Sequence, residues 1–173
     1  MKIENYGVVL TRLTEEKIEL VRNWRNDPKI SQYMEFKEYI TPEMQINWFR
    51  RIDNENNFYF IIEFEKKEIG LINVRDIDYN EKVGEGGIFI YDDDCLNSDL
   101  SFRVGVLLND FCFETLKLEK LKAHILNNNK RAIQFNKMFG YKIVDGQDDV
   151  NNQLYYLLRS DYIEKKERII RLF

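Results

Sequence analysis

The sequence has little proline, glycine, cysteine and histidine, and each shortage excludes a kind of protein. Two prolines and eight glycines in 173 residues argue against long linkers and low-complexity tails. The two cysteines, Cys95 and Cys112, lie too far apart for a CxxC pair, and the single histidine, His124, has no metal-ligand residue near it in the sequence. We therefore expect reduced thiols and no structural or catalytic metal.

Strong charge and long apolar runs are missing as well. The net charge is −4 at pH 7, so the sequence lacks the excess of positive charge that favours binding to nucleic acid or to an anionic membrane. The first residues, MKIENYGVVLTRL, lack the apolar core of a signal peptide, and no apolar run approaches the length that spans a membrane. These observations predict a cytoplasmic protein with neither nucleic acid nor membrane as a partner.

What is present is a globular composition with clear changes of hydrophobic period. Hydrophobic residues make up 44% of the chain, which suits one domain with a sizeable core. An apolar run at residues 8–13 predicts a strand. A helix is predicted after Thr14, ended by turn residues at 26–28, and a second helix has Thr41 as its N-cap and Pro42 at its first position.

Further along, strand patterns alternate with helical ones. Three segments rich in aromatic and β-branched residues predict strands joined as antiparallel hairpins, at 58–65, 68–79 and 86–91. The rest predicts a helix near 102–116, a strand at 118–126, a helix at 129–140, strands at 141–144 and 154–158, and a final helix capped by Asp161. Residues 1–173 are thus predicted to form one α+β domain with a mixed sheet and no internal repeat.

Three stretches resemble motifs of one enzyme superfamily. NKRAIQFNKMFGY, at residues 129–141, resembles the helix motif N-x-x-A-x-x-x-Y-x-x-x-G-F of the GNAT superfamily of acetyl-CoA-dependent N-acetyltransferases. LYYLLRSDY, at 154–162, resembles the closing Y-x-L-L-R-x-x-Y of its ribosomal-protein and polyamine branches. VRNWRNDPKISQYM and ITPEMQINWF resemble a narrower subgroup that acetylates nucleotide-linked amino sugars, as in pseudaminic acid biosynthesis, except that Gln45 replaces a histidine.

The resemblance implies a GNAT fold, with a mostly antiparallel, splayed central sheet flanked by helices. It also implies acetyl-CoA as co-substrate, a small-molecule primary amine as acceptor, and Glu85 as the general base that deprotonates this amine. The coenzyme would contact the strand residues Ile88, Phe89 and Ile90, the loop and helix start at Ser98, Asp99, Leu100, Ser101 and Phe102, and Asn129. The acceptor would contact Trp24, Arg25, Asn26, Gln45 and Trp48.

Two positions depart from the family pattern. In the phosphate loop, R/Q-x-x-G-x-G/A, Asp99 and Ser101 stand in the glycine positions, which puts a carboxylate near an anionic ligand. Asn136 stands where the family has a tyrosine that protonates the departing thiolate, and an amide cannot transfer a proton at neutral pH. Either water or another group, such as Tyr141 or Tyr91, supplies that proton, or the enzyme is slow, or the site no longer acetylates.

Less specific interpretations stay open for several residues. Without the resemblance, Trp24 and Trp48 are core aromatics, and Glu85 is a strand-edge carboxylate. His124 lies on the face of its strand opposite the apolar residues. This position favours a hydrogen-bonded histidine on the surface or in a cleft over a catalytic base.

The predicted function is acetyl transfer to the amine of a nucleotide-linked amino sugar. The alternatives are a polyamine or protein N-terminal acetyltransferase, and a degenerate GNAT domain that acts as a binding module. Dimers are common in this superfamily, but no patch in the sequence predicts a homodimer.

Overall fold

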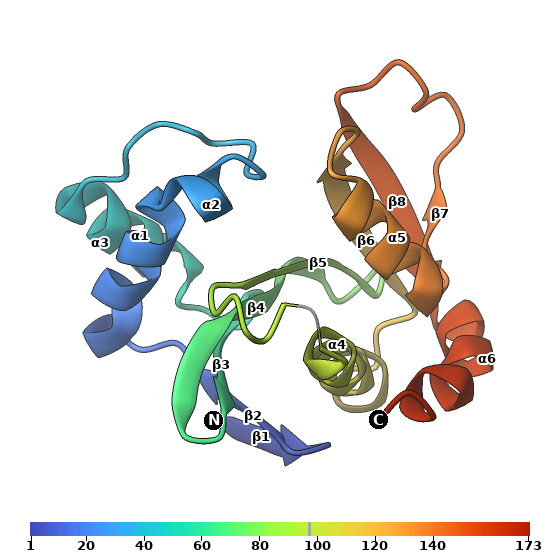
Figure 1. Cartoon of the computed structure of the whole chain (residues 1–173). Coiled ribbons are helices and arrows are strands. Elements are labelled where there is room, and N and C mark those ends of the chain that lie inside the picture. The colour runs from blue at the N-terminus through green and yellow to red at the C-terminus, as the bar shows by residue number, and fades with distance from the viewer. Residues whose placement is uncertain (97) are drawn as a thin grey trace.

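An eight-stranded mixed sheet forms the centre of the computed structural model, which describes residues 1–96 and 98–173 (Figure 1). Its strands are β1 (Lys2–Asn5), β2 (Val8–Arg12), β3 (Phe58–Phe64), β4 (Lys67–Asp78), β5 (Val83–Ile90), β6 (Lys120–Leu126), β7 (Lys142–Ile143) and β8 (Asn152–Leu158). The order across the sheet is β1-β2-β3-β4-β5-β6-β8-β7. β5 and β6 pair in parallel, whereas the other neighbours pair antiparallel. The predicted α+β fold with a mixed, mostly antiparallel sheet is confirmed.

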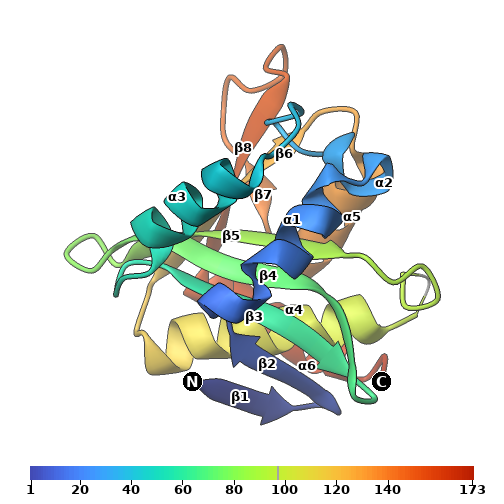
Figure 2. The same ribbon diagram turned by 90° about the vertical axis from the view of Figure 1, so that its left-hand side faces the viewer.

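Helices cover both faces of this sheet (Figure 2). On one face lie α1 (Ile18–Asn26), α2 (Pro28–Ser31) and α3 (Pro42–Ile52), and on the other lie α4 (Leu100–Asp110), α5 (Lys130–Phe139) and α6 (Arg159–Ile170). Successive strand residues therefore enter opposite cores, because side chains alternate across a strand. Phe60 joins the core on the α4 side, and Ile61 joins the smaller core under α1 and α3. No helix in the described part of the chain is long and apolar enough to cross a membrane.

Several local signals in the sequence form the contacts that they predict. The Thr41 hydroxyl accepts a hydrogen bond from the Met44 N–H at 3.2 Å, and Pro42 occupies the first position of α3. The Asn129 side chain accepts from the Ala132 N–H at 3.1 Å and so caps α5. Gly140 ends α5 with a φ of +105°, a left-handed conformation that glycine adopts without strain.

A close contact between α4 and α5 fixes the separation of the two helices that flank the opening between β5 and β6. Gly105 on α4 makes it possible, because a Cβ atom there would lie 2.5 Å from Cζ of Phe139 on α5. The rings of Phe102 and Phe135 add a second contact, with centroids 5.3 Å apart.

Near the N-terminus the structure differs from the sequence prediction in two features, the strand β1 and the start of α1. β1 was not predicted, because its side chains are mostly exposed and show no apolar alternation. It turns back onto β2 through Tyr6 and Gly7, whose φ angles are +56° and +74°. Thr14 makes no side-chain capping bond, and a short 3₁₀ turn (Glu15–Lys17) precedes α1.

Two further differences concern later helices. α6 begins at Arg159, so the prediction that Asp161 is its N-cap is wrong. The Asp161 carboxylate instead lies 2.8 Å from Nζ of Lys142, a contact between elements that the sequence does not reveal. α4 continues as a π-helical segment (Phe111–Thr115), in which Phe111 and Phe113 are buried in the core.

Candidate active site

The two central strands separate after a short paired stretch. β5 and β6 pair in parallel only from Val83 to Glu85 on one strand and from Lys120 to Lys122 on the other. Beyond these residues the strands diverge (Figure 1), so the backbone of β5 from Gly86 to Ile90 pairs with β4 alone among the described strands. Backbone N–H and C=O groups that lack a partner strand are ready to pair with an extended ligand. Ile88, Phe89 and Ile90, predicted to bind the coenzyme, lie on this free edge.

Glu85, the predicted general base, lies at the point where the strands separate, and its side chain is only 8% exposed. Its Oε1 atom accepts from Nη2 of Arg75 at 2.5 Å and lies 3.2 Å from Nδ1 of His124. Its Oε2 atom lies 3.8 Å from Nζ of Lys122. The register explains this cluster, because Glu85 is directly opposite Arg75 on β4 and Lys122 on β6.

A second guanidinium approaches this cluster from α1. Arg25 is half-buried, and its Nε atom has no hydrogen-bond partner among the described residues. Burial lowers the pKa of Arg25, Tyr59 opposes that shift, and the charge of Arg75 adds to it. Burial likewise raises the pKa of Tyr59, which keeps its hydroxyl neutral. The face of the sheet under α1 thus holds a guanidinium for which the described ranges, 1–96 and 98–173, provide no ion-pair partner.

The other residues predicted to bind the acceptor make mainly structural contacts. Trp24 is 5% exposed and stacks on Tyr91 with ring centroids 5.6 Å apart. The Asn26 amide exchanges two hydrogen bonds with the backbone of Ile40, at 2.8 and 2.9 Å. Gln45 is 2% exposed and donates to the Ile18 carbonyl at 2.9 Å.

Trp48 differs from these three, because it remains half-exposed. Its ring meets Tyr59 edge-on, with centroids 5.1 Å apart. Of the five predicted acceptor residues, Arg25 and Trp48 lie beside the polar cluster. The other three hold α1, α3 and the loop between them in place.

The predicted phosphate loop leads into the start of α4. Ser98 accepts from the Leu100 N–H at 3.2 Å, and Ser101 and Phe102 lie in the first turn of the helix. The Asp99 carboxylate is engaged by Arg103, one turn along, at 2.7 and 3.1 Å. This pairing offsets the negative charge that Asp99 adds at a helix N-terminus. Asn97, in the same predicted loop, lies outside the described residues.

The start of α5 lies next to this loop. Asn129 caps the helix, and the guanidinium of Arg131 contacts the Leu96 carbonyl. Positive charge therefore stands close to the start of α4, where the helix dipole also favours an anion.

The two candidates for the general acid, Tyr141 and Tyr91, lie in different places, and Asn136 makes a contact within its own helix. The Asn136 amide donates to the Ala132 carbonyl of its own helix at 2.8 Å. Tyr141 is 7% exposed, and its hydroxyl lies 3.4 Å from the position that a Cβ of Gly86 would take, at the edge of β5. Burial raises the pKa of Tyr141, which keeps its proton in place. The Tyr91 hydroxyl, by contrast, donates to Asp27 at 3.1 Å, near α2.

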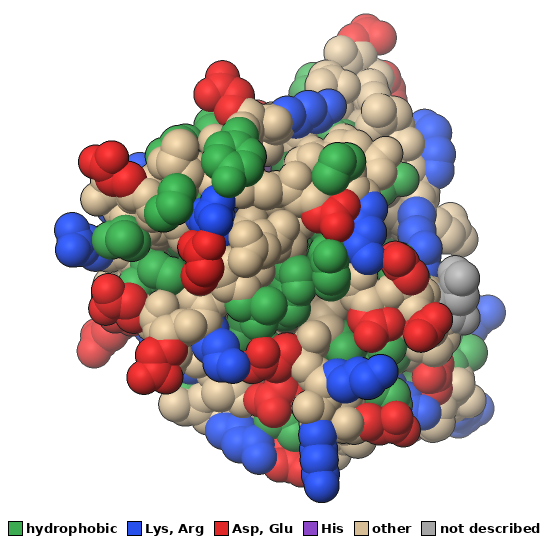
Figure 3. Space-filling model, turned by 60° about the vertical axis from the view of Figure 1, so that its left-hand side comes forward, with side chains coloured by type: hydrophobic (Ala, Val, Ile, Leu, Met, Phe, Trp, Pro, Cys, Tyr) green, Lys and Arg blue, Asp and Glu red, His purple; other side chains and the backbone are tan. Residues whose placement is uncertain are grey.

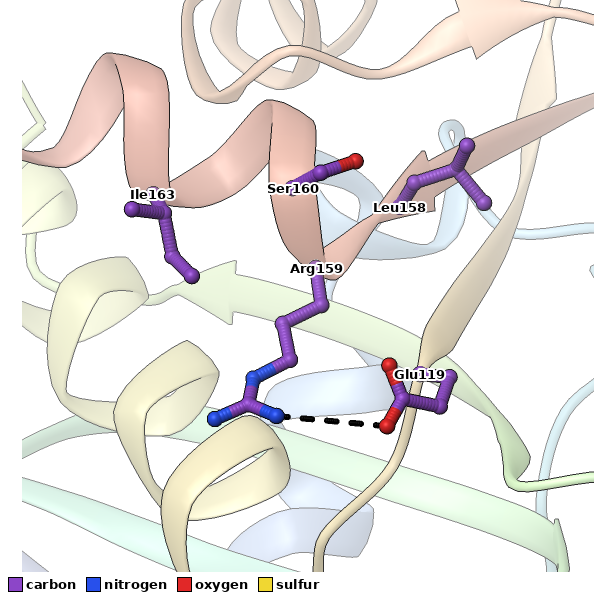
Figure 4. Close-up of a pocket in the computed structure, with 5 residues that line it drawn as sticks. All are labelled: Glu119, Leu158, Arg159, Ser160 and Ile163. Carbon is purple, nitrogen blue, oxygen red and sulfur yellow. Dashed lines mark ion pairs between the residues drawn. The ribbon is translucent and has the colours of Figure 1, made fainter.

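Two surface hollows lie away from the diverging strands. One, of about 430 Å³, lies where β8 meets α6, and Arg159 and Glu119 face each other across it at 3.9 Å (Figure 4). The other, of about 330 Å³, lies beside the β3–β4 turn, and its lining includes Ser98, Asp99 and Leu100 of the predicted phosphate loop. Lys67 and Arg103 line it together with Asp92 and Asp94, so it holds charges of both signs. The first hollow contains no predicted site residue. Among the described residues, no group of three or more His, Cys, Asp or Glu side chains is placed to hold a metal ion.

The sequence did not identify Arg75, Tyr59, Lys122 or His124 as site residues. The available signal was the alternation of Lys120, Lys122 and His124 with apolar residues along β6. Which of these face Glu85 depends on the register between strands, and a single sequence does not give that register.

The splayed sheet and the polar cluster define the class of protein. The chain matches the family model described as acetyltransferase (GNAT) domain over residues 8–142, and it belongs to that family. The predicted fold and family are therefore confirmed, and the family is one of acetyltransferases.

Among individual proteins, the chain is similar to two from Campylobacter jejuni subsp. jejuni that share one name, acetyltransferase PseH. It is 27% identical to that of serotype O:23/36 (strain 81-176) and 28% identical to that of serotype O:2 (strain ATCC 700819 / NCTC 11168). Each match spans 153 residues, 86% of this chain and 89% of the relative.

Solved structures share the fold. Apo FdhC, a nucleotide-linked sugar GNAT, superimposes with a TM-score of 0.81 and 21% identity over 99% of this chain and 98% of its own. The spermidine N-acetyltransferase from Vibrio cholerae in complex with CoA and spermine gives a TM-score of 0.75 and 19% identity over 92% of this chain and 99% of its own.

Proposed function

We propose that the chain transfers the acetyl group of acetyl-CoA to the primary amine of a nucleotide-linked amino sugar. The two PseH relatives and the FdhC fold neighbour support this direction. The observation that carries the choice of acceptor is Arg25, whose Nε atom has no hydrogen-bond partner within the described part of the chain. Its positive charge adds to that of Arg75. Arg75 and Lys122 already contact the buried carboxylate of Glu85, and the exposed Asp76 adds only a distant contact to Arg75 at 3.8 Å.

An acceptor that carries an anionic group would supply the missing partner. A nucleoside diphosphate is such a group, and charge-assisted hydrogen bonds to guanidinium are among the stronger ones in proteins. A polyamine would instead bring further positive charge to this face. The charge arrangement therefore favours a nucleotide-linked acceptor over spermidine, although a spermidine acetyltransferase shares the fold.

Exposed aromatic side chains suit the same kind of acceptor. Tyr33, Phe36 and Tyr39, in the loop between α2 and α3, are 51%, 42% and 67% exposed. Figure 3 shows hydrophobic side chains on this side of the molecule among interspersed acidic and basic ones. Aromatic surfaces bind sugar and base rings through their faces and leave polar groups free for hydrogen bonds.

Acetyl-CoA would bind along the free edge of β5, with its phosphates at the start of α4 and close to Arg131. The parts present fit this co-substrate: an unpaired strand edge, a helix N-terminus and nearby positive charge. The thioester would then lie where β5 and β6 separate, beside Glu85 and His124. The degenerate-module alternative predicts no such binding.

A thiol-release assay with acetyl-CoA tests the acceptor directly. We expect the wild type to prefer a UDP-linked 4-amino sugar to spermidine by about tenfold or more in kcat/KM, because one charge-assisted hydrogen bond is worth ~1.5–3 kcal/mol. Arg25→Gln should remove most of that preference, whereas Arg50→Gln, an exposed arginine on α3, should leave it unchanged. A preference for spermidine would refute the proposed acceptor. Calorimetry that detects no acetyl-CoA binding would refute the enzyme and favour a binding module.

A further inference from the structure

Glu85 and His124 form a pair in which the carboxylate is buried and the imidazole is accessible to solvent. His124 is the single histidine of the sequence. Its Nδ1 atom lies 3.2 Å from Oε1 of Glu85, and its side chain is 38% exposed, against 8% for Glu85. A molecule that enters between the diverging strands therefore meets the imidazole before it meets the carboxylate.

Glu85 is poorly suited to take the proton itself. Arg75 donates to its Oε1 atom at 2.5 Å and Lys122 lies 3.8 Å from its Oε2 atom, so both carboxylate oxygens already face cations. Because it is buried, it also cannot reach an amine without an intervening group. The carboxylate can still accept from an imidazole N–H, which is how acidic side chains commonly orient histidine.

The surroundings of His124 leave its second nitrogen available. A carboxylate oxygen only accepts, so Glu85 favours the tautomer with hydrogen on Nδ1 and a lone pair on Nε2. The charged groups around the pair are Glu85 from β5, Arg75 from β4 and Lys122 from β6. On β8 the residue opposite His124 is Leu154, which is apolar.

We propose that His124 is the general base of the acetyl transfer and that Glu85 is a positioning residue that orients it. This inference rests on the proposed function for its substrate. Nε2 takes one proton from the acceptor ammonium, and the nitrogen lone pair then forms a bond to the thioester carbonyl carbon. The carbonyl π electrons move to oxygen, which forms a tetrahedral intermediate. When they return to reform the carbonyl, the C–S bond breaks and its electron pair stays on sulfur as the thiolate. The second proton on nitrogen goes to the thiolate, which yields the amide and the free thiol, and the imidazolium releases its proton to solvent.

Nuclear magnetic resonance tests the pair without any acceptor, because one histidine gives one set of imidazole signals. The ¹⁵N shifts of uniformly labelled protein should show hydrogen on Nδ1 at pH 8. Glu85→Gln should shift the tautomer balance toward Nε2–H, and acetyl-CoA should move the signals of the wild type. The proposal would be overturned if the wild type carried its hydrogen on Nε2. It would also be overturned if neither Glu85→Gln nor acetyl-CoA changed the imidazole ¹⁵N shifts.

Kinetics with the best amine of the acceptor screen test the proton transfer. His124→Gln should lower kcat by about 10²–10⁴-fold, the usual contribution of a general base, and should abolish the fall in kcat/KM at acidic pH. Glu85→Gln should give a smaller loss and shift that acidic limb, while Arg50→Gln, an exposed arginine on α3, should change kcat by less than about threefold.

Two kinetic results would oppose the proposal. The first is an acidic limb that survives in His124→Gln, and the second is one that disappears only in Glu85→Gln. If no amine in the screen is acetylated, the proposed function fails, and the resonance experiment still decides the geometry of the pair.

Discussion

Replacing Arg25 by methionine should make the fold more stable and the enzyme less active. A charge that is fully buried without a partner costs several kcal/mol, and Arg25 is only half-buried, so with solvent screening we expect a gain of about 1 kcal/mol. For a domain of this size that gain corresponds to a rise in Tm of about 2–4 °C. Methionine keeps an unbranched side chain of similar reach and removes the charge.

Arg22, one turn earlier on α1, provides a matched control with the opposite expected sign. Its guanidinium donates to Glu19 at 2.5 and 2.8 Å, to the Tyr39 hydroxyl at 3.0 Å and to the Ile40 carbonyl at 2.9 Å. Arg22→Met should therefore destabilise the fold by about 2 kcal/mol, since it removes several charge-assisted bonds that tie the loop before α3 to α1.

Thermal melting, followed by circular dichroism with and without UDP, measures both effects. UDP should raise the Tm of the wild type by mass action, because only the folded state binds it, and should not raise that of Arg25→Met. If Arg25→Met lowers the Tm as Arg22→Met does, then Arg25 has a structural role and the argument for an anionic acceptor fails. Equal stabilisation of both proteins by UDP would place the nucleotide elsewhere.

Three further predictions concern the coenzyme side. Arg131→Gln should weaken acetyl-CoA binding about tenfold in calorimetry, while Lys137→Gln, exposed near the far end of α5, should not; equal affinities would exclude Arg131 from the phosphate site. Gly105→Ala should lower stability by about 1–3 kcal/mol in urea unfolding, because its Cβ would lie 2.5 Å from Phe139; unchanged stability would mean that α5 moves freely. Asn136→Tyr should raise kcat, because it adds a phenol at the family's acid position; an unchanged kcat would locate the acid elsewhere.

Much of the fold was predictable because short-range signals agree with each other. The Thr41–Pro42 start of α3, the Asn129 cap and the Gly140 end of α5 each act within one helical turn, so the local sequence carries them. The strand segments show apolar and aromatic patterns that can be recognised in the sequence without knowing which strands lie next to them. β1 escaped prediction because it is an exposed edge strand, which needs no apolar face.

The candidate site was predictable only in part, and the reason is register. The motif around Trp24 and Asn26 also contains Arg25, but the side chains of Trp24 and Asn26 hold the core beneath α1 and the loop before α3. Glu85 was identified by its place on the central strand. His124 lies 39 positions later in the sequence, and only strand pairing brings it within 3.2 Å of Glu85.

By itself, the sequence determined the order of elements, the caps that begin and end the helices, and membership of an acetyltransferase family, since each depends on residues close together in the chain. The tertiary structure decided which polar side chains meet. It surrounded Glu85 with Arg75, Lys122 and His124, and it left the Nε atom of Arg25 without a hydrogen-bond partner among the residues that the structure describes. Those outcomes depend on where β5 and β6 separate and on which faces the helices cover. Such long-range geometry sets burial and charge together, and no local pattern records it.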